Sequence, residues 1–143
     1  MKINLTDKKV IITGGSTGIG KEVVKLFAEN KSKIALFDVN DSDGSNLSNE
    51  LNKKGSEIRY WHLDVRDSNQ VSGGVLAANQ WLGGVDILIN LAGILQGASL
   101  DIEKFPDDIW ESVIGVNLTG SYLMVKHVSE IMIKQEKGEI ILT

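Results

Sequence analysis

The amino-acid sequence predicts an α/β fold, in which four helices cover a doubly wound parallel sheet of five strands. Five short, mainly apolar runs alternate along the chain with segments of helical periodicity. The runs are continuously apolar, which is typical of strands buried on both faces. A glycine-rich turn directly follows the first run and opens the first helical segment. We therefore expect one domain over residues 1–143 with the strand order 3-2-1-4-5.

Each predicted strand is a short run between charged or turn-forming residues. The first run, Val10-Ile11-Ile12, consists of β-branched residues, which favour extended backbone. The five runs cover residues 10–12, 34–37, 58–63, 85–91 and 140–142. The predicted order places the last run at an open edge of the sheet.

Helical periodicity fills the gaps between these strands. Apolar residues recur every four positions at Ile19, Val23 and Phe27. A similar pattern covers residues 71–82, and a weaker one covers residues 42–54. Each of these segments therefore indicates a helix that follows one strand and precedes the next.

The fourth predicted helix is one long amphipathic stretch over residues 107–134. Pro106 suits its first position and Gly138 suits its end. At about 100° per residue, Asn117 lies on the same apolar stripe as Trp110 and Val128. We therefore expect this asparagine to be buried and to need hydrogen-bond partners.

Two adjacent glycines, Gly73 and Gly74, interrupt the third predicted helix. Each glycine in a helix interior costs about 1 kcal/mol relative to alanine. The sequence alone offers no reason for either of them.

The composition favours a soluble cytoplasmic protein. The chain has 42% hydrophobic residues, 24% charged residues and a net charge of -4, which argues against a nucleic-acid partner. It lacks a signal peptide and an apolar stretch of the ~20 residues that span a bilayer, so we expect no membrane partner. No cysteine is present, and no acidic or histidine cluster has metal-ligand spacing, so no metal site is predicted. His62 and His127 are unpaired and are interpreted as structural or solvated.

Residues 13–20, with the sequence TGGSTGIG, have the composition and the position of a phosphate-binding turn between a strand and a helix. Gly14 permits a sharp turn, Gly18 allows a pyrophosphate to approach the backbone, and Gly20 allows the helix to pack close to the sheet. The helix N-terminus then offers free N–H groups and a partial positive charge to phosphate.

Two other interpretations of this loop remain open. Gly15, Gly20 and Lys21 fit the P-loop spacing G-x-x-x-x-G-K, but Glu22 stands where a P-loop needs Ser or Thr for magnesium. In the second interpretation, the loop is a glycine-rich turn that binds no ligand.

Asp38 ends the second predicted strand, where an acidic residue accepts hydrogen bonds from the adenosine ribose hydroxyls of a dinucleotide. Its carboxylate would repel the 2′-phosphate of NADP. No Arg or Lys occupies positions 16 or 17, and Val39 and Asn40 follow Asp38. The pattern predicts NAD as cofactor; the alternative is a solvated residue at a strand end.

Together with this loop, three further motifs in matching order make the whole chain resemble the short-chain dehydrogenase/reductase family. Asp64 follows the third strand in Leu63-Asp64-Val65, and the fourth strand leads into Asn90-Leu91-Ala92-Gly93. The long helix carries an Asn-x-x-Gly element that begins at Asn117. Leu91 departs from the usual Asn-Asn-Ala-Gly pattern of the family.

The resemblance implies a Rossmann-like fold and a role for each motif. Asp64 and Val65 would cap the adenine, and Asn117 would be the catalytic asparagine that holds a proton-relay water. Asn90, Ala92 and Gly93 would line the ribose and support the central strand. The complete predicted cofactor-binding set is Gly14, Ser16, Thr17, Gly18, Ile19, Gly20, Asp38, Val39, Asp64, Val65, Asn90, Ala92 and Gly93.

Simpler roles remain open for the two asparagines. Asn90 can cap a strand end. Asn117 can be a mid-helix polar residue whose side chain is satisfied by backbone groups.

The implied activity is hydride transfer between NAD and an alcohol or ketone, with a tyrosine as general acid/base and a lysine that lowers the tyrosine pKa. Of the substrate contacts, only Ile94, Leu95 and Gln96 fall in this sequence. The catalytic Ser, Tyr and Lys of the family would follow Thr143, so we expect a C-terminally incomplete domain that is inactive alone. The alternative is a naturally short, non-catalytic nucleotide-binding or interaction module.

Tyr122 and Lys126 have the four-residue spacing of the family's catalytic pair but precede the fifth strand. On an ideal helix they lie about 140° and about 180° around from Asn117. We therefore interpret Tyr122 as an interface or half-buried residue and Lys126 as a solvated charge.

The fifth strand and the outer side of the long helix are candidate contacts between copies of the chain. The fifth strand is a short apolar edge, which invites pairing with another chain. The outer side of helix 107–134, near Tyr122 and Ile133, resembles the region through which family members dimerise. We expect a homo-oligomer through this helix, and marginal stability and self-association for the isolated chain.

Overall fold

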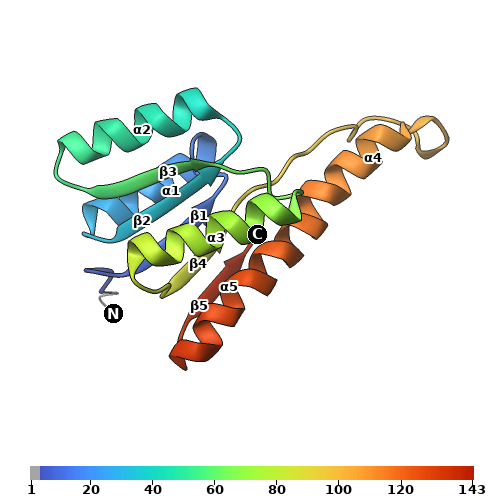
Figure 1. The fold of residues 1–143 in the computed structure, drawn as a ribbon. Helices are drawn as coiled ribbons and strands as arrows, with labels where there is room; N and C mark the ends of the chain where they lie inside the picture. Colours follow the sequence, from blue (N-terminus) through green and yellow to red (C-terminus); the bar gives the residue numbers. More distant parts are fainter. Residues whose placement is uncertain (1–3) are drawn as a thin grey trace.

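The computed structural model describes residues 4–143, which form one parallel sheet flanked by helices on both faces (Figure 1). The strand order is β3-β2-β1-β4-β5, and all four strand pairs are parallel, as predicted. The strands are β1 (Lys9–Thr13), β2 (Lys33–Asp38), β3 (Glu57–His62), β4 (Ile87–Asn90) and β5 (Glu139–Leu142).

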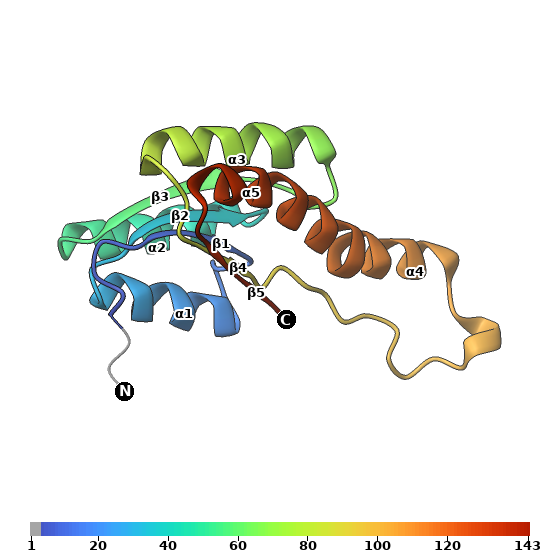
Figure 2. The same cartoon turned by 90° about the horizontal axis from the view of Figure 1, so that it is seen from below.

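The helices divide between the two faces of this sheet. Figure 2 shows α3 and α5 on one face and α1 on the other. The helical segments are α1 (Gly18–Glu29), α2 (Asp41–Lys53), α3 (Ser68–Leu82), the 3₁₀ turn η1 (Ile102–Lys104), α4 (Asp107–Ile114), the π-helical segment η2 (Gly115–Gly120) and α5 (Ser121–Gln135). None of the helices in residues 4–143 is long and apolar enough to cross a bilayer.

The core consists of two hydrophobic clusters, one on each side of the sheet. Ile11 and Phe37 join the cluster under α3 and α5, whereas Ile12 and Leu36 join the cluster under α1 and α2. All four side chains are fully buried. Successive strand residues therefore enter opposite clusters, which explains why the predicted strands are continuously apolar.

The fourth predicted helix is continuous but not uniform. Between α4 and α5, the six residues of η2 form a π-helix, whose i→i+5 hydrogen bonds shift the rotation of one half against the other. The stripe expected from ideal α-helical periodicity therefore breaks: Val128 is fully buried, but Trp110 is 58% exposed. In both views α4 projects beyond the sheet, and none of its residues is fully buried (Figures 1 and 2).

Pro106 and Gly138 do not occupy the helix positions that the sequence analysis expected. Pro106 is the N-cap and not the first helical residue. The helix ends at Gln135, because Glu136 adopts the left-handed conformation and donates its N–H toward Met132 and Ile133 carbonyls. Gly138 instead lies where a β-carbon would collide with Met132, so it allows β5 to approach α5.

β5 lies at the open edge of the sheet, as predicted. It pairs only with β4 among the described strands, and each of its four residues is exposed. Ile141 and Leu142 thus present apolar surface at this edge.

The two glycines of α3 have different surroundings. A β-carbon at Gly73 would meet no atom of residues 4–143 within 4 Å, whereas one at Gly74 would collide with Leu63. Leu63 is only 2% exposed, so its side chain has little room to move. Gly74 is explained by packing; nothing in the structure explains Gly73.

We predict that Gly73→Ala raises the free energy of unfolding by about 1 kcal/mol, because alanine removes the helix penalty of glycine without a clash. Gly74→Ala should lack this gain, because it must displace Leu63. Urea denaturation of both variants checks the difference. Equal stabilisation by the two substitutions would contradict the proposed packing role of Gly74.

Candidate functional site

The carboxyl ends of β1, β2, β3 and β4 surround a cleft of about 410 Å³. Because parallel strands end at the same edge, residues that are distant in sequence meet here. The predicted binding residues on its wall are Gly14, Thr17, Asp38, Val39, Asp64, Val65, Ala92 and Gly93. The structure therefore brings together all four predicted segments: the glycine loop and the three strand ends that follow it.

The other predicted binding residues, Ser16, Gly18, Ile19, Gly20 and Asn90, do not line this cleft. Ile19 is 81% exposed at the start of α1, whereas Ser16 and Asn90 are buried behind the wall. They can contribute to the cleft by shaping it or by binding a ligand that extends from it toward α1.

Asn90 stabilises the segment that follows β4. Its Oδ1 accepts a hydrogen bond from the Thr13 hydroxyl (2.8 Å), and its Nδ2 donates to the Ser121 hydroxyl (3.0 Å). The Thr13 hydroxyl oxygen also accepts the N–H of Ala92 (3.1 Å). Asn90 thus ties together β1, the start of α5 and the cleft wall at Ala92, which agrees with the predicted support of the central strand.

The glycine loop is shaped by close backbone packing. Gly14 has a φ of 67°, and a β-carbon there would lie 2.7 Å from the backbone of Ala92. A β-carbon at Gly20 would collide with the Gly14 carbonyl oxygen and lie 2.8 Å from the Gly15 Cα. The expected role of Gly20 is therefore corrected: it lets the first turn of α1 pack on the loop itself and not on the sheet.

The start of α1 has unused hydrogen-bonding capacity. Thr17 precedes the helix in extended conformation, and its side chain does not cap the helix within the described chain. The Ser16 hydroxyl is buried and has no partner in residues 4–143. Free N–H groups at a helix N-terminus beside an unpaired hydroxyl fit an anion such as phosphate.

Asp38 is held in place from two sides. Its Oδ2 accepts the N–H of Ser16 (3.1 Å), and its Oδ1 accepts the N–H of Asn40 (3.0 Å). The carboxylate therefore joins the glycine loop to the turn between β2 and α2. The Asp38 residue is partly buried, and its carboxylate is bound by backbone N–H groups on two sides.

Arg66 is a cleft residue that sequence reasoning missed. Its Nη2 lies 2.6 Å from Asp64 Oδ2, and its Nε lies 3.0 Å from Asp64 Oδ1. This guanidinium holds the pKa of Asp64 below its usual value. The available signal was a basic residue two positions after the acidic strand end. The wall of the cleft therefore carries both positive and negative charge, and a ligand that binds Asp64 would compete with Arg66 for the carboxylate.

Asn117 lies beside the cleft and not in the core. Its Oδ1 accepts the N–H of Ile94 and its Nδ2 donates to the Ile94 carbonyl, both at 2.9 Å. The residue is exposed, so the expectation of burial is wrong, because η2 breaks the apolar stripe on which it rested. The need for partners is met by backbone groups, which is the simpler role that the sequence left open.

The segment after β4 continues the wall of the cleft. Ile94 and Gln96 line it, together with Ser112 and Val116 of the long helix, which the sequence did not single out. Leu95 points into solvent and is 85% exposed. The pair of contacts from Asn117 to Ile94 thus fixes one side of the cleft.

Tyr122 and Lys126 lie elsewhere. Both are exposed, and Lys126 Nζ lies 5.9 Å from the centre of the Tyr122 ring. They border a shallow apolar groove with Leu118, Val125 and Leu142, and neither lines the cleft. The structure separates this pair from the candidate site.

Known proteins share this sequence pattern. The chain matches the family profile described as short chain dehydrogenase over residues 8–143. It is 39% identical to (+)-borneol dehydrogenase 1 of Salvia officinalis over 97% of the chain, and 38% identical to the 3-oxoacyl-[acyl-carrier-protein] reductase FabG of Chlamydia pneumoniae over 99%. These matches cover 52% and 56% of the two relatives, so the chain spans about half of their length.

Solved structures share the fold. An NAD⁺-bound xylitol dehydrogenase matches with a TM-score of 0.90 and 32% identity, over 96% of this chain and 53% of the other. A short-chain type dehydrogenase/reductase from Mycobacterium marinum matches with a TM-score of 0.90 and 28% identity, over 97% and 56%.

Proposed function

The chain belongs to the short-chain dehydrogenase family, and we propose that its cleft binds NAD as the nucleotide-binding part of an oxidoreductase acting on an alcohol or ketone. The observation that carries the choice of NAD is Asp38. Its carboxylate is held by two backbone N–H groups beside the phosphate-type turn. A carboxylate in this position accepts hydrogen bonds from the ribose hydroxyls and repels a 2′-phosphate.

The residues present fit the phosphates of such a cofactor. A β-carbon at Gly14 or Gly20 would distort the loop, and the loop offers the unpaired Ser16 hydroxyl as well as the N-terminus of α1. Gly18 has open space in front of it, because a β-carbon there would meet nothing within 4 Å in residues 4–143. We assign the pyrophosphate to this loop.

We assign the two ends of the cofactor to opposite parts of the cleft. Asp64 and Val65, with Arg66, border the adenine side at the end of β3. Ala92, Gly93 and Ile94 border the other side after β4. NAD supplies the hydride acceptor when it is bound.

Family membership and the named relatives support the proposed substrate class. Borneol and xylitol dehydrogenases are named for alcohols, and the FabG relative for a 3-oxoacyl substrate, which contains a ketone. In the whole protein, Ile94 and Gln96 would contact such a substrate, and Asn117 would position the proton-relay water. Both polar atoms of the Asn117 side chain bind the Ile94 backbone. Asn117 would therefore position the water through its own main-chain groups, or indirectly by stabilising the cleft wall at Ile94.

We also propose that the long helix forms a contact between copies of the chain in a soluble, cytoplasmic oligomer. Tyr122, which is 59% exposed, lines the apolar groove that reaches Leu142 of β5, and Ile133, which is 73% exposed, lies farther along α5. Apolar side chains gathered on one helix face beside a sheet edge favour burial against another copy.

The cofactor assignment predicts the effect of Asp38→Ala. Loss of a charged acceptor should weaken NAD binding about 10- to 100-fold, because a hydrogen bond to a charged group contributes about 1.5–3 kcal/mol. NADP binding should change little or improve. Calorimetric titration of both cofactors checks this, with Asp101→Ala as a control outside the cleft. An unchanged preference in Asp38→Ala would refute the assignment.

The position of Tyr122 predicts that the 143-residue chain alone does not oxidise alcohols, because Tyr122 and Lys126 lie outside the cleft. NADH formation with a panel of secondary alcohols should stay at background, while NAD binding confirms that the chain is folded. Turnover that disappears in Tyr122→Phe would overturn this prediction.

The association proposal predicts concentration-dependent self-association of the 143-residue chain in sedimentation velocity. Ile133→Lys should weaken it, because a charge would enter the contact. Leu76→Lys is the matched control, since Leu76 is 58% exposed on α3. A monomer at all concentrations, or equal effects of the two lysines, would contradict a contact through α5.

A further inference from the structure

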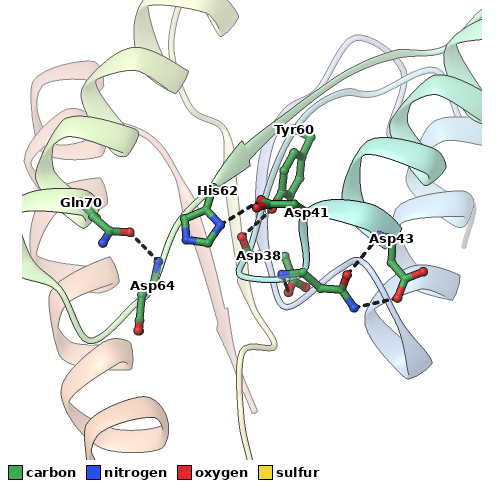
Figure 3. A network of polar contacts seen from close by, with 8 residues as sticks. Asp38, Asp41, Asp43, Tyr60, His62, Asp64 and Gln70 are labelled. Atoms are coloured by element: carbon green, nitrogen blue, oxygen red, sulfur yellow. Dashed lines mark hydrogen bonds and ion pairs between the residues drawn. The ribbon is translucent and has the colours of Figure 1, made fainter.

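A chain of polar contacts extends from Asp38 into β3 and the start of α2 (Figure 3). The Tyr60 hydroxyl lies 2.9 Å from the Asp38 carbonyl oxygen and 2.7 Å from Asp41 Oδ1. His62 Nδ1 lies 2.9 Å from the same Asp41 oxygen. Three side chains outside the cleft wall thus converge on the turn that carries Asp38.

The fold reserves space for this arrangement. A β-carbon at Gly44 in α2 would collide with the ring of Tyr60. Glycine inside a helix costs about 1 kcal/mol relative to alanine, so its presence here is offset by the packing that it allows. Tyr60 is therefore seated between α2 and the sheet, with its hydroxyl directed at the turn.

The hydroxyl acts as a donor in this position. Burial, with the adjacent Asp41, raises the pKa of Tyr60 above its usual value, so the phenol keeps its proton. The hydrogen bond from Tyr60, followed by that from His62, lowers the pKa of Asp41. A neutral donor thus lies between a carbonyl and an ionised carboxylate.

These contacts decide the shape of residues 38–41. The Asn40 N–H that binds the Asp38 carboxylate belongs to this turn. The Asn40 side chain caps α2 by accepting the Asp43 N–H (3.1 Å). The Tyr60 hydroxyl has one proton to donate, which the Asp38 carbonyl and the Asp41 carboxylate share, and its oxygen lies within 2.9 Å of both acceptors. A change in these contacts would move the Asn40 N–H relative to Asp38.

We propose that Tyr60 and Asp41, supported by His62, are positioning residues that hold the Asp38 turn in the shape that selects NAD over NADP. The inference rests on the proposed function, because it acts through Asp38 on the adenosine ribose. It adds specificity determinants in β3 and α2 that do not themselves line the cleft.

The first test compares Tyr60→Phe with Tyr122→Phe, which removes the same hydroxyl from an exposed position on α5. Tyr60→Phe keeps the ring against Gly44. Binding of NAD and of ADP-ribose should weaken about fivefold, as expected for one lost hydrogen bond. Binding of NADP and of nicotinamide mononucleotide should stay within twofold. Tyr122→Phe should leave all four dissociation constants unchanged.

A double-mutant cycle tests whether Tyr60 acts through Asp38. In the Asp38→Ala background, Tyr60→Phe should cause no further loss of NAD affinity. Asp41→Asn, a surface change that keeps the shape of the side chain, should reduce the NAD preference in the same direction. This second variant serves if Tyr60→Phe does not fold.

The outcomes separate the possible roles. A lower Tm for Tyr60→Phe with an unchanged NAD-to-NADP ratio would mean a purely structural role and would overturn the proposal. So would an undiminished effect of Tyr60→Phe in the Asp38→Ala background. Failure of the unmodified protein to bind NAD would refute the proposed function itself, and that result is visible before any variant is compared.

Discussion

The structure depends on the burial of β1 on both faces and along both edges. β1 pairs with β2 and β4, and its residues Val10, Ile11 and Ile12 have no exposed surface. A strand in this position needs parallel neighbours and helices on both sides, because its backbone and side chains are all withdrawn from water. The crossovers that satisfy this constraint bring the carboxyl ends of four strands to one edge. The cleft is a consequence of that topology.

The cleft in turn depends on close backbone approach and on a few shared polar groups. Gly14 and Gly20 allow the loop, the start of α1 and the backbone of Ala92 to meet within van der Waals distance. Thr13 and Asn90 tie this junction to α5 through Ser121. The long helix therefore does more than cover the sheet. Through Asn117 and Ser121 it contributes hydrogen bonds that hold the far wall of the site.

Charge around the cleft is distributed unevenly. Asp64 is balanced by Arg66, whereas Asp38 is bound by neutral N–H groups, and Asp41 by a phenol and an imidazole. The end of β2 thus keeps its negative character, while the end of β3 does not. This asymmetry is consistent with a cofactor whose ribose carries hydroxyls.

The sequence by itself determined the fold class, the strand order, and the meeting of the glycine loop with Asp38, Asp64 and Ala92. These follow from periodicity and from spacing along the chain, which local residue patterns carry. Only the tertiary structure decided that η2 breaks the long helix, that Asn117 holds the Ile94 backbone, that Arg66 pairs with Asp64, and that Tyr60 reaches Asp41. The contacts of Asn117 and Tyr60 each join two elements that are distant in sequence, so they depend on how those elements pack, whereas the Arg66 pair had a local signal two positions after Asp64. The π-helical turn changes the rotation of the long helix and so redirects the side chains beyond it, which ideal α-helical periodicity does not anticipate.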